Sequence, residues 1–319
     1  MTTRNARVYA VLAGGVGAAR FLRGLTAAVD PSDVVAIVNV GDDLTLHGLR
    51  ICPDLDSITY WLSGVVHPTQ QWGRADETHT VATELRRYGH DGWFTLGDRD
   101  LATHLHRTER LREGGVLSQV TDEIRRAFGV GVRLVPATDD HLETRIHTVD
   151  GRDLHFQEYW VRERAAPDVA RITFDGAAAA KPAPGVVEAI LAAETVLVAP
   201  SNPAVSIDPI LAVPGVREAL HRTPAPVVGV SPIIGGRVVR GMAHRLLPAL
   251  GVEVSAAGVA AHYGDLLDGW VLDTTDADQS AVVEAGGTRC VTTPTLMDDI
   301  EVAAALARTC LSLAAEVRT

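Results

Sequence analysis

The chain has 319 residues, 46% of them hydrophobic and 22% charged, which suits a globular protein of one large α/β domain or two smaller ones. A net charge of −11 at pH 7 argues against a nucleic-acid partner, because such partners need a basic face. No apolar run reaches the roughly 18 residues of a membrane span, the N-terminus has no signal-peptide core and the three cysteines form no paired motif, so we expect a cytoplasmic protein without membrane contact.

The first 29 residues read as a strand, a tight turn and a helix. An apolar run at Val8–Leu12 leads into Gly14, Gly15 and Gly17, and helical spacing of apolar residues follows at Ala18–Val29. Glycines at such a turn let the backbone approach a ligand, and the first N–H groups of a helix attract phosphate. A purely structural turn between strand and helix is the alternative.

The glycine turn matches neither common nucleotide motif. It reads G-x-G-x-x-R over Gly15–Arg20, and no Gly-Lys-Ser/Thr follows, so a P-loop is excluded. A dinucleotide site would place an acidic residue at the end of the second strand, which we expect at Val34–Val38, but Asn39 stands there. Asn39 therefore becomes a candidate ligand-binding residue in its place.

Four carboxylates follow the second strand within fifteen residues. They form the pairs Asp42–Asp43 and Asp54–Asp56. Mg²⁺ prefers one or two carboxylates together with substrate phosphates, so this set is a candidate metal site. A helix cap, on a helix expected to run to Leu62, plus solvated loop charges is the alternative.

A second polar cluster, Gly97–Asp100, follows a short strand expected at Trp93–Leu96. Arg99 has the chemistry to grip a phosphate, and Asp98 to orient it or cap the next helix. A capped turn with solvated charges is the alternative. His104 receives little weight, because a lone histidine is more often packed or solvated than catalytic.

Strands and helices alternate over most of the remaining chain. Further helices are expected from Asp76 or Thr78 to Tyr88 and at Leu101–Leu111, Ser118–Phe128, Val186–Ala193 and Asp298–Val317. Further strands are expected at Val132–Val135, Thr195–Ala199, Val227–Val230, Val252–Ser255 and Trp270–Asp273. This order predicts an α/β fold with a Rossmann-like, mostly parallel, doubly wound sheet, whose ligands bind beyond the carboxyl ends of the strands.

An antiparallel segment interrupts the alternation. Asp150-Gly151 is a strong hairpin signal between Thr144–Val149 and Arg152–Trp160. We therefore expect one α/β domain over residues 1–319 with a hairpin-containing insertion near 139–184. The sequence leaves open whether the insertion is a lid or a dimer contact.

Two later loops carry uncharged polar groups at expected strand ends. One contains Ser201 and Asn202 between two prolines, and the other runs from Ser231 to Gly236 and includes Gly235. Neither contains the G-x-S-x-G elbow of covalent hydrolases. Recognition of a base, sugar or diphosphate is the functional interpretation, and ordinary turn chemistry is the alternative.

Taken in order, AGGVGAARFLRGL, VNVGDDLTLHGLRICPDLDS, WFTLGDRDLATHL, HFQEYWV, APSNPAVSIDPIL and VSPIIGG resemble the 2-phospho-L-lactate transferase family of coenzyme F420 biosynthesis, especially its actinobacterial members. The resemblance implies a Mg²⁺-dependent homodimer. It moves a phospholactyl or phosphoenolpyruvyl group from a guanosine diphosphate-linked donor, supplied by a guanylyltransferase, to the ribityl hydroxyl of the deazaflavin Fo, and releases GMP. Which three-carbon acid is used stays open.

The resemblance also distributes roles over the motifs. Asp43 and Asp56 would hold Mg²⁺ or the ribityl hydroxyls and act in catalysis with Arg99, which would steady the transferred phosphate. Asp56 and Thr95 would line the Fo pocket. The other expected substrate-binding residues are Gly14, Gly15, Gly17, Asn39, Ser201, Asn202, Ser231 and Gly235.

Two other functions remain in play at this point. A regulatory protein that binds sugar nucleotides on the same scaffold would share the glycine turn, but the ICPDLD, GDRDLATH and HFQEYWV segments fit the transferase pattern. An NAD-dependent oxidoreductase is disfavoured by Asn39, which occupies the position of the expected acid.

Overall fold

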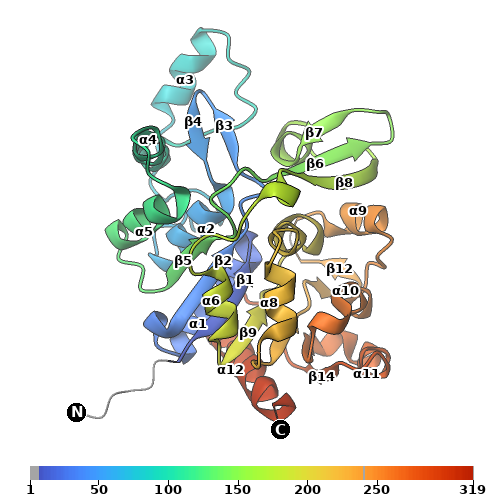
Figure 1. Cartoon of the computed structure of the whole chain (residues 1–319). Coiled ribbons are helices and arrows are strands. Elements are labelled where there is room, and N and C mark those ends of the chain that lie inside the picture. The colour runs from blue at the N-terminus through green and yellow to red at the C-terminus, as the bar shows by residue number, and fades with distance from the viewer. Residues whose placement is uncertain (1–6, 240, 319) are drawn as a thin grey trace, which may run out of the picture.

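The computed structural model describes residues 7–239 and 241–318. Within them, seven parallel strands form a central sheet in the order β14-β13-β10-β9-β1-β2-β5 (Figure 1). The strands are β1 (Tyr9–Ala13), β2 (Val34–Val38), β5 (Arg133–Pro136), β9 (Thr195–Val198), β10 (Val227–Val230), β13 (Gly269–Leu272) and β14 (Arg289–Thr292). The prediction of a Rossmann-like, mostly parallel sheet is confirmed.

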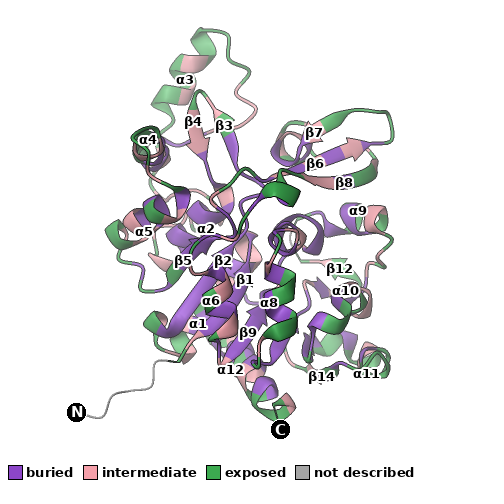
Figure 2. Cartoon of the chain, viewed as in Figure 1, coloured by how far each residue is buried: buried purple, intermediate pink, exposed green. Residues whose placement is uncertain are grey.

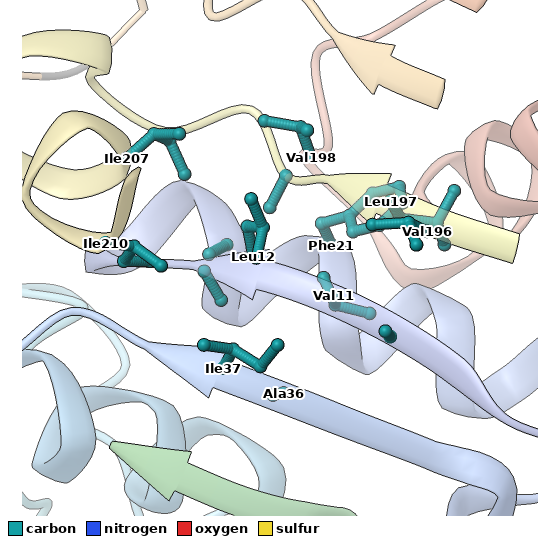
Figure 3. Close-up of a cluster of buried hydrophobic side chains, with 14 of the residues drawn as sticks. Val11, Leu12, Phe21, Ala36, Ile37, Val196, Leu197, Val198, Ile207 and Ile210 are labelled. Carbon is teal, nitrogen blue, oxygen red and sulfur yellow. The ribbon is translucent and has the colours of Figure 1, made fainter. Parts of the chain in front are cut away.

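Strand β1 lies at the centre of the sheet and of the core. Leu12 pairs with Ile37 of β2 on one side and with Val198 of β9 on the other. Figure 3 shows these side chains in the same buried cluster as Phe21 of the first helix. Because helices cover both faces of a parallel sheet, its strands must be apolar on both faces, which explains the continuous rather than alternating hydrophobic runs.

Helices cover both faces of the sheet. The longer ones are α1 (Gly15–Ala28), α2 (Pro53–Leu62), α3 (Thr80–Arg87), α4 (Asp98–Arg112), α5 (Leu117–Ala127), α8 (Val216–Arg222), α10 (Ala256–Tyr263) and α12 (Ile300–Val317). The shorter ones are α6 (Val186–Leu191), α7 (Asp208–Leu211), α9 (Ala243–Leu246) and α11 (Ser280–Ala285). Helix α1 packs against α2 and α12, whereas α6 packs against α8, which lies in front of the sheet in Figure 1.

The chain reverses direction across the sheet between β1 and β9. It winds outward from β1 through β2 to β5, and from β9 through β10 and β13 to β14. Ligands of doubly wound sheets bind at this switch point, beyond the carboxyl ends of the two central strands. The glycine turn after β1 and the Ser201 loop after β9 therefore meet at the same edge of the sheet.

Small antiparallel sheets rise above that edge. One contains β6 (Glu143–Thr148), β7 (Asp153–His155) and β8 (Val169–Asp175), and lies inside the segment 139–184 that we expected to be inserted. Two others are the hairpins β3 (Leu44–Leu46) with β4 (Leu49–Ile51), and β11 (Ile233–Ile234) with β12 (Arg237–Val238). In Figure 1 the β6–β8 sheet stands opposite α3 and α4.

Three expected strands are wrong in detail. Residues Trp93–Leu96 form a loop, apolar because it packs against the β3–β4 hairpin. The second hairpin strand ends at His155, and Glu158–Arg162 is a helical turn whose Tyr159 is buried. Residues Val252–Ser255 are also not a strand, because Ser255 is the N-cap of α10 and accepts the Gly258 N–H.

Burial follows this arrangement (Figure 2). The central strands are buried, whereas α3 contains no buried residue and projects from the molecule. No helix in the described part of the chain is long and apolar enough to cross a membrane.

Candidate active site

A cavity of about 600 Å³ opens at the switch point of the sheet. Its walls come from the glycine turn, the start of α2, the loop before α4, the helical turn after β7, and the loops after β9 and β10. Ligand pockets of proteins typically measure about 300–1,000 Å³, so this cavity can hold an organic substrate.

Gly14, Gly15 and Gly17 all line the cavity, as the sequence predicted. Their small size is required by neighbouring protein atoms. A Cβ on Gly14 would lie 2.8 Å from Asp54 Oδ2, and one on Gly17 would lie 2.2 Å from the Pro200 carbonyl oxygen. Gly15 has a φ of +69°. The glycines therefore let the carboxylate of α2 and the loop after β9 reach the N-terminus of α1.

Asn39 is fully buried beneath the cavity rather than on its wall. Its Nδ2 donates to Asp42 Oδ1 over 3.1 Å and to Asp54 Oδ2 over 2.9 Å, and its Oδ1 accepts the Gly41 N–H. Both carboxylates line the cavity. Asn39 thus acts by holding two acidic side chains together.

Burial raises the pKa values of both carboxyl groups. The pKa of Asp54 rises to about 6, although hydrogen bonds from Asn39 and the Gly15 backbone offset part of the effect. The pKa of Asp42 rises further, because the charge of Asp54 adds to the burial. Burial destabilises the ionised form of both carboxyl groups, and a bound cation would stabilise that form.

The two carboxylates that we expected to hold metal are paired with arginines. Asp43 Oδ2 lies 3.0 Å from Arg50 Nη2, and Asp43 is not among the lining residues. Its Oδ1 is buried without a hydrogen-bond partner among the described residues. Asp56 lines the cavity, but both of its oxygens accept from the buried Arg107 guanidinium.

A further buried cluster continues from this ion pair along α4. His104 Nδ1 lies 3.2 Å from Arg107 Nη1, and its Nε2 lies 3.3 Å from Asp100 Oδ2. Asp100 Oδ1 accepts from the Tyr60 hydroxyl over 2.6 Å. Asp100, His104 and Tyr60 all line the cavity. His104 receives little weight from sequence alone, because its neighbours Asp100 and Arg107 on α4 gain their own partners, Tyr60 and Asp56, only where α2 meets α4.

Aromatic side chains form another part of the wall. They are Tyr60, Trp72, Phe94, Phe156 and Trp160. Trp72 and Trp160 remain 53% and 40% exposed, so both have apolar surface available to a ligand. Thr95, expected in the acceptor pocket, lines the cavity beside Phe94.

The insertion reaches this wall through its HFQEYWV segment. Phe156, Trp160 and Val161 line the cavity, and Gln157 Nε2 lies 3.4 Å from Asp42 Oδ2. His155 Nε2 lies 3.2 Å from the Asp43 carbonyl oxygen. Segment 139–184 therefore forms part of the cavity wall.

The loops after β9 and β10 supply uncharged polar groups. Ser201, Asn202 and Ser231 line the cavity. Ser201 Oγ donates to the Gly14 carbonyl over 2.8 Å, which ties this loop to the glycine turn. Gly235 does not line the cavity; its N–H donates to Asp276 Oδ2.

Arg99 is exposed and lies outside the lining residues. Its segment is explained by reciprocal capping. Asp98 accepts the Thr80 and Val81 N–H groups at the start of α3, and hydrogen bonds, that from Thr78 above all, lower its pKa to about 2. Glu77 in turn accepts the Arg99 and Asp100 N–H groups of α4. Capping therefore accounts for the charged residues of this segment without a substrate, and Arg99 does not line the cavity.

No group of three or more His, Cys, Asp or Glu side chains in residues 7–239 and 241–318 is arranged to hold a metal ion. The pair Asp42 and Asp54 is nevertheless chemically suited to Mg²⁺, which takes one or two carboxylates and completes its shell with water and phosphate. The position of this pair beside the α1 N-terminus would bring such an ion next to a bound phosphate.

Comparison with protein families gives one match over most of the chain. Residues 10–306 match the model of "2-phospho-L-lactate transferase CofD". The chain is 55% identical over 313 residues to a phosphoenolpyruvate transferase of Kitasatospora aureofaciens, covering 96% of this chain and 98% of that one. It is 52% identical to the Streptomyces coelicolor protein of the same name, covering 97% and 98%, and 46% identical to that of Mycolicibacterium smegmatis, covering 95% and 98%.

Among solved structures, a member of the UPF0052 family from Bacillus halodurans shares the fold. The match has a TM-score of 0.65 and 17% sequence identity, and covers 97% of this chain and 99% of that one. This likeness bears on the fold alone.

Proposed function

The chain belongs to the 2-phospho-L-lactate transferase CofD family and is a transferase of coenzyme F420 biosynthesis; we propose that it moves a phosphoenolpyruvyl group from a guanosine diphosphate-linked donor to the ribityl hydroxyl of Fo, releasing GMP. The names of the relatives favour the phosphoenolpyruvyl over the phospholactyl group. The observation that carries the proposal is one cavity in which a helix N-terminus, acidic side chains and aromatic walls face each other.

The donor diphosphate is assigned to the glycine turn. Helix α1 begins at Gly15, and its first residues line the cavity with backbone N–H groups that favour phosphate. Ser201, Asn202 and Ser231 lie on the adjoining wall, where they would contact the guanosine. Fo is assigned to the aromatic wall around Phe94 and Thr95, since a planar tricyclic ring needs apolar faces.

Mg²⁺ is assigned to Asp42 and Asp54 rather than to Asp43 and Asp56. The first pair lines the cavity and is held by amide groups, whereas Asp43 and Asp56 already pair with arginines. When bound there, Mg²⁺ would neutralise charge on the diphosphate during transfer. Asp56, with its oxygens fixed by Arg107, is left to contact Fo, as the sequence suggested.

Transfer needs positioning and charge stabilisation more than a protein nucleophile. The glycine turn would fix the donor phosphorus and the aromatic wall would bring the ribityl chain toward it. The O–P bond to Fo forms as the phosphoanhydride bond to GMP breaks, and the hydroxyl proton is released. Homodimer formation, supply of the donor by a guanylyltransferase and a cytoplasmic location remain predictions.

Mass spectrometry of a reconstituted reaction tests the proposal. The protein is incubated with Fo, GTP, Mg²⁺, a guanylyltransferase and either phosphoenolpyruvate or phospholactate. We expect GMP and the Fo phosphodiester with the enolpyruvyl mass, and neither with Asp54→Asn. Absence of any Fo phosphodiester, together with binding of a UDP-sugar, would instead support the sugar-nucleotide-binding alternative.

A further inference from the structure

His104 is a buried polar side chain on the cavity wall, and the reaction proposed above assigns it no role. Its side chain is 1% exposed. Its Nε2 makes no aligned hydrogen bond among the described residues, although Asp100 Oδ2 lies 3.3 Å away. A buried polar atom without a hydrogen-bond partner destabilises the folded protein, and a ligand that supplies the partner offsets this cost.

The neighbours of His104 determine which of its two ring nitrogens carries the hydrogen. Arg107 Nη1 lies 3.2 Å from His104 Nδ1, and a guanidinium only donates. Nδ1 therefore accepts, and a neutral ring carries its hydrogen on Nε2. Arg107 is held in turn by Asp56, so the ring is fixed from behind.

Asp100 is also held in place by hydrogen bonds. Its Oδ1 accepts from the Tyr60 hydroxyl over 2.6 Å, and its backbone N–H donates to Glu77 Oε1 over 2.8 Å. The remaining oxygen, Oδ2, is the one nearest His104. A fixed N–H donor and a fixed carboxylate acceptor thus stand side by side on the cavity wall.

We propose that His104 and Asp100 together bind the attacking hydroxyl of the acceptor, with His104 Nε2–H donating to the hydroxyl oxygen and Asp100 Oδ2 accepting its hydrogen. This assignment rests on the proposed function and deepens it. An alcohol needs one donor and one acceptor on adjacent atoms, which this pair supplies.

The pair also accounts for the proton of the reaction. As the hydroxyl oxygen bonds to phosphorus, the phosphoanhydride P–O bond breaks and its electron pair leaves with GMP. The hydroxyl proton passes to Asp100 Oδ2. One O–H and one P–O bond are broken, one P–O and one O–H bond are formed, and no other reactant is required.

The other carboxylates of the cavity are less suited to this role. Asp56 has both oxygens on Arg107, whereas Asp42 and Asp54 are held together by Asn39. Asp100 also lies on the same helix as His104, one turn away, so α4 sets their spacing.

Binding of two acceptor ligands tests the pair. The probes are Fo and an Fo analogue whose terminal ribityl hydroxyl is replaced by hydrogen, titrated by deazaflavin fluorescence. The variants are Asp100→Asn and His104→Phe. His106→Phe is the matched control, because His106 lies on the same helix but is exposed and contacts Glu123.

Wild-type protein should bind Fo about tenfold more tightly than the deoxy analogue, because only Fo satisfies both groups. Asp100→Asn and His104→Phe should each lose most of this discrimination, because each removes one of the two partners, and should transfer about 100-fold more slowly. His106→Phe should behave as wild type. If His104→Phe does not fold, His104→Leu, which also lacks a side-chain N–H, gives the same comparison.

Undiminished discrimination against the deoxy analogue in Asp100→Asn and in the His104 variant would overturn the inference. Turnover of Asp100→Asn within threefold of wild type would do the same. In both cases a wild-type enzyme that still makes the Fo phosphodiester leaves the proposed function standing. A wild-type protein that makes no such product removes the proposed function itself.

Discussion

The amide nitrogen of Asn39, at the end of β2, donates to Asp54 Oδ2, in the first turn of α2, over 2.9 Å. The same nitrogen donates to Asp42 Oδ1. One neutral side chain therefore holds two carboxylates at the cavity, and the acid that a dinucleotide site would place here would repel both of them.

Replacing Asn39 by alanine should weaken metal binding and the fold together. Two buried carboxylates would lose a donor, which costs about 1 to 3 kcal/mol for each unsatisfied group. We expect a lower urea midpoint and at least tenfold weaker Mg²⁺ binding by calorimetry. Gln157→Ala, which removes a longer contact to Asp42, is the milder control. Unchanged Mg²⁺ affinity in Asn39→Ala would contradict the metal assignment.

Asp54→Asn should stabilise the metal-free protein while abolishing transfer. The pKa of Asp54 is about 6 in the folded protein, above its ordinary value of 3.8, so burial of ionised Asp54 costs stability above pH 6. This cost disappears as pH falls through 6 toward 4. The difference is up to about 3 kcal/mol.

Thermal unfolding in EDTA at several pH values measures this effect. Asp54→Asn should exceed wild type in Tm at pH 8, and the gap should narrow toward pH 5. A variant that is less stable than wild type at pH 8 would show that Asp54 is not a source of strain in the metal-free protein.

Gly17→Ala and Gly24→Ala should both lower the free energy of unfolding, but only Gly17→Ala should also impair donor binding. A Cβ on Gly17 would meet the Pro200 carbonyl at 2.2 Å and displace the loop that carries Ser201. One on Gly24 would meet the Ala303 backbone at 2.4 Å, away from the cavity. Each change should cost about 1 to 3 kcal/mol by denaturation, but only Gly17→Ala should raise the donor KM severalfold. Equal donor KM values for the two variants would argue against the glycine turn as the diphosphate site.

Two arginines of α4 should differ in their response to replacement by glutamine: Arg107→Gln should have a large effect and Arg99→Gln a small one. Arg107→Gln leaves Asp56 buried without its partner and should destabilise by about 3 to 5 kcal/mol with loss of turnover. Arg99→Gln should stay within about 0.5 kcal/mol and threefold in kcat, because Arg99 is exposed. A large loss of kcat with normal stability in Arg99→Gln would restore the phosphate-gripping role that the sequence suggested.

The sheet was predictable because its strands carry continuous apolar runs that end in glycine or polar residues. Val34–Val38 and Val227–Val230 have the bounds expected from sequence. The same signal fails at Trp93–Leu96, where apolar side chains serve a loop that walls the cavity. A run of apolar residues indicates that a segment packs against the core. Over only four residues, this pattern is the same for a strand of a parallel sheet and for a packed loop.

The site was predictable by segment and much less by side chain. The glycine turn, the PDLD segment and the Ser201 loop all reach the cavity. Spacing does not reveal that Asp56 meets Arg107, 51 positions later, because the packing of α2 near α4 decides it. The family resemblance suggested Asp43 and Asp56 as metal ligands, but both pair with arginines, whereas Asp42 and Asp54 have no arginine partner within residues 7–239 and 241–318.

The contact between α12 and α1 ties donor recognition to the last helix of the chain. Ala303 of α12 packs directly on Gly24, about two turns along the helix whose N-terminus is the proposed phosphate site. Shortening the protein at its carboxyl terminus by the length of α12 would uncover the back of α1 and let its glycine-rich tip shift. Tolerance to deletion should therefore end sharply at this helix, even though it never approaches a substrate.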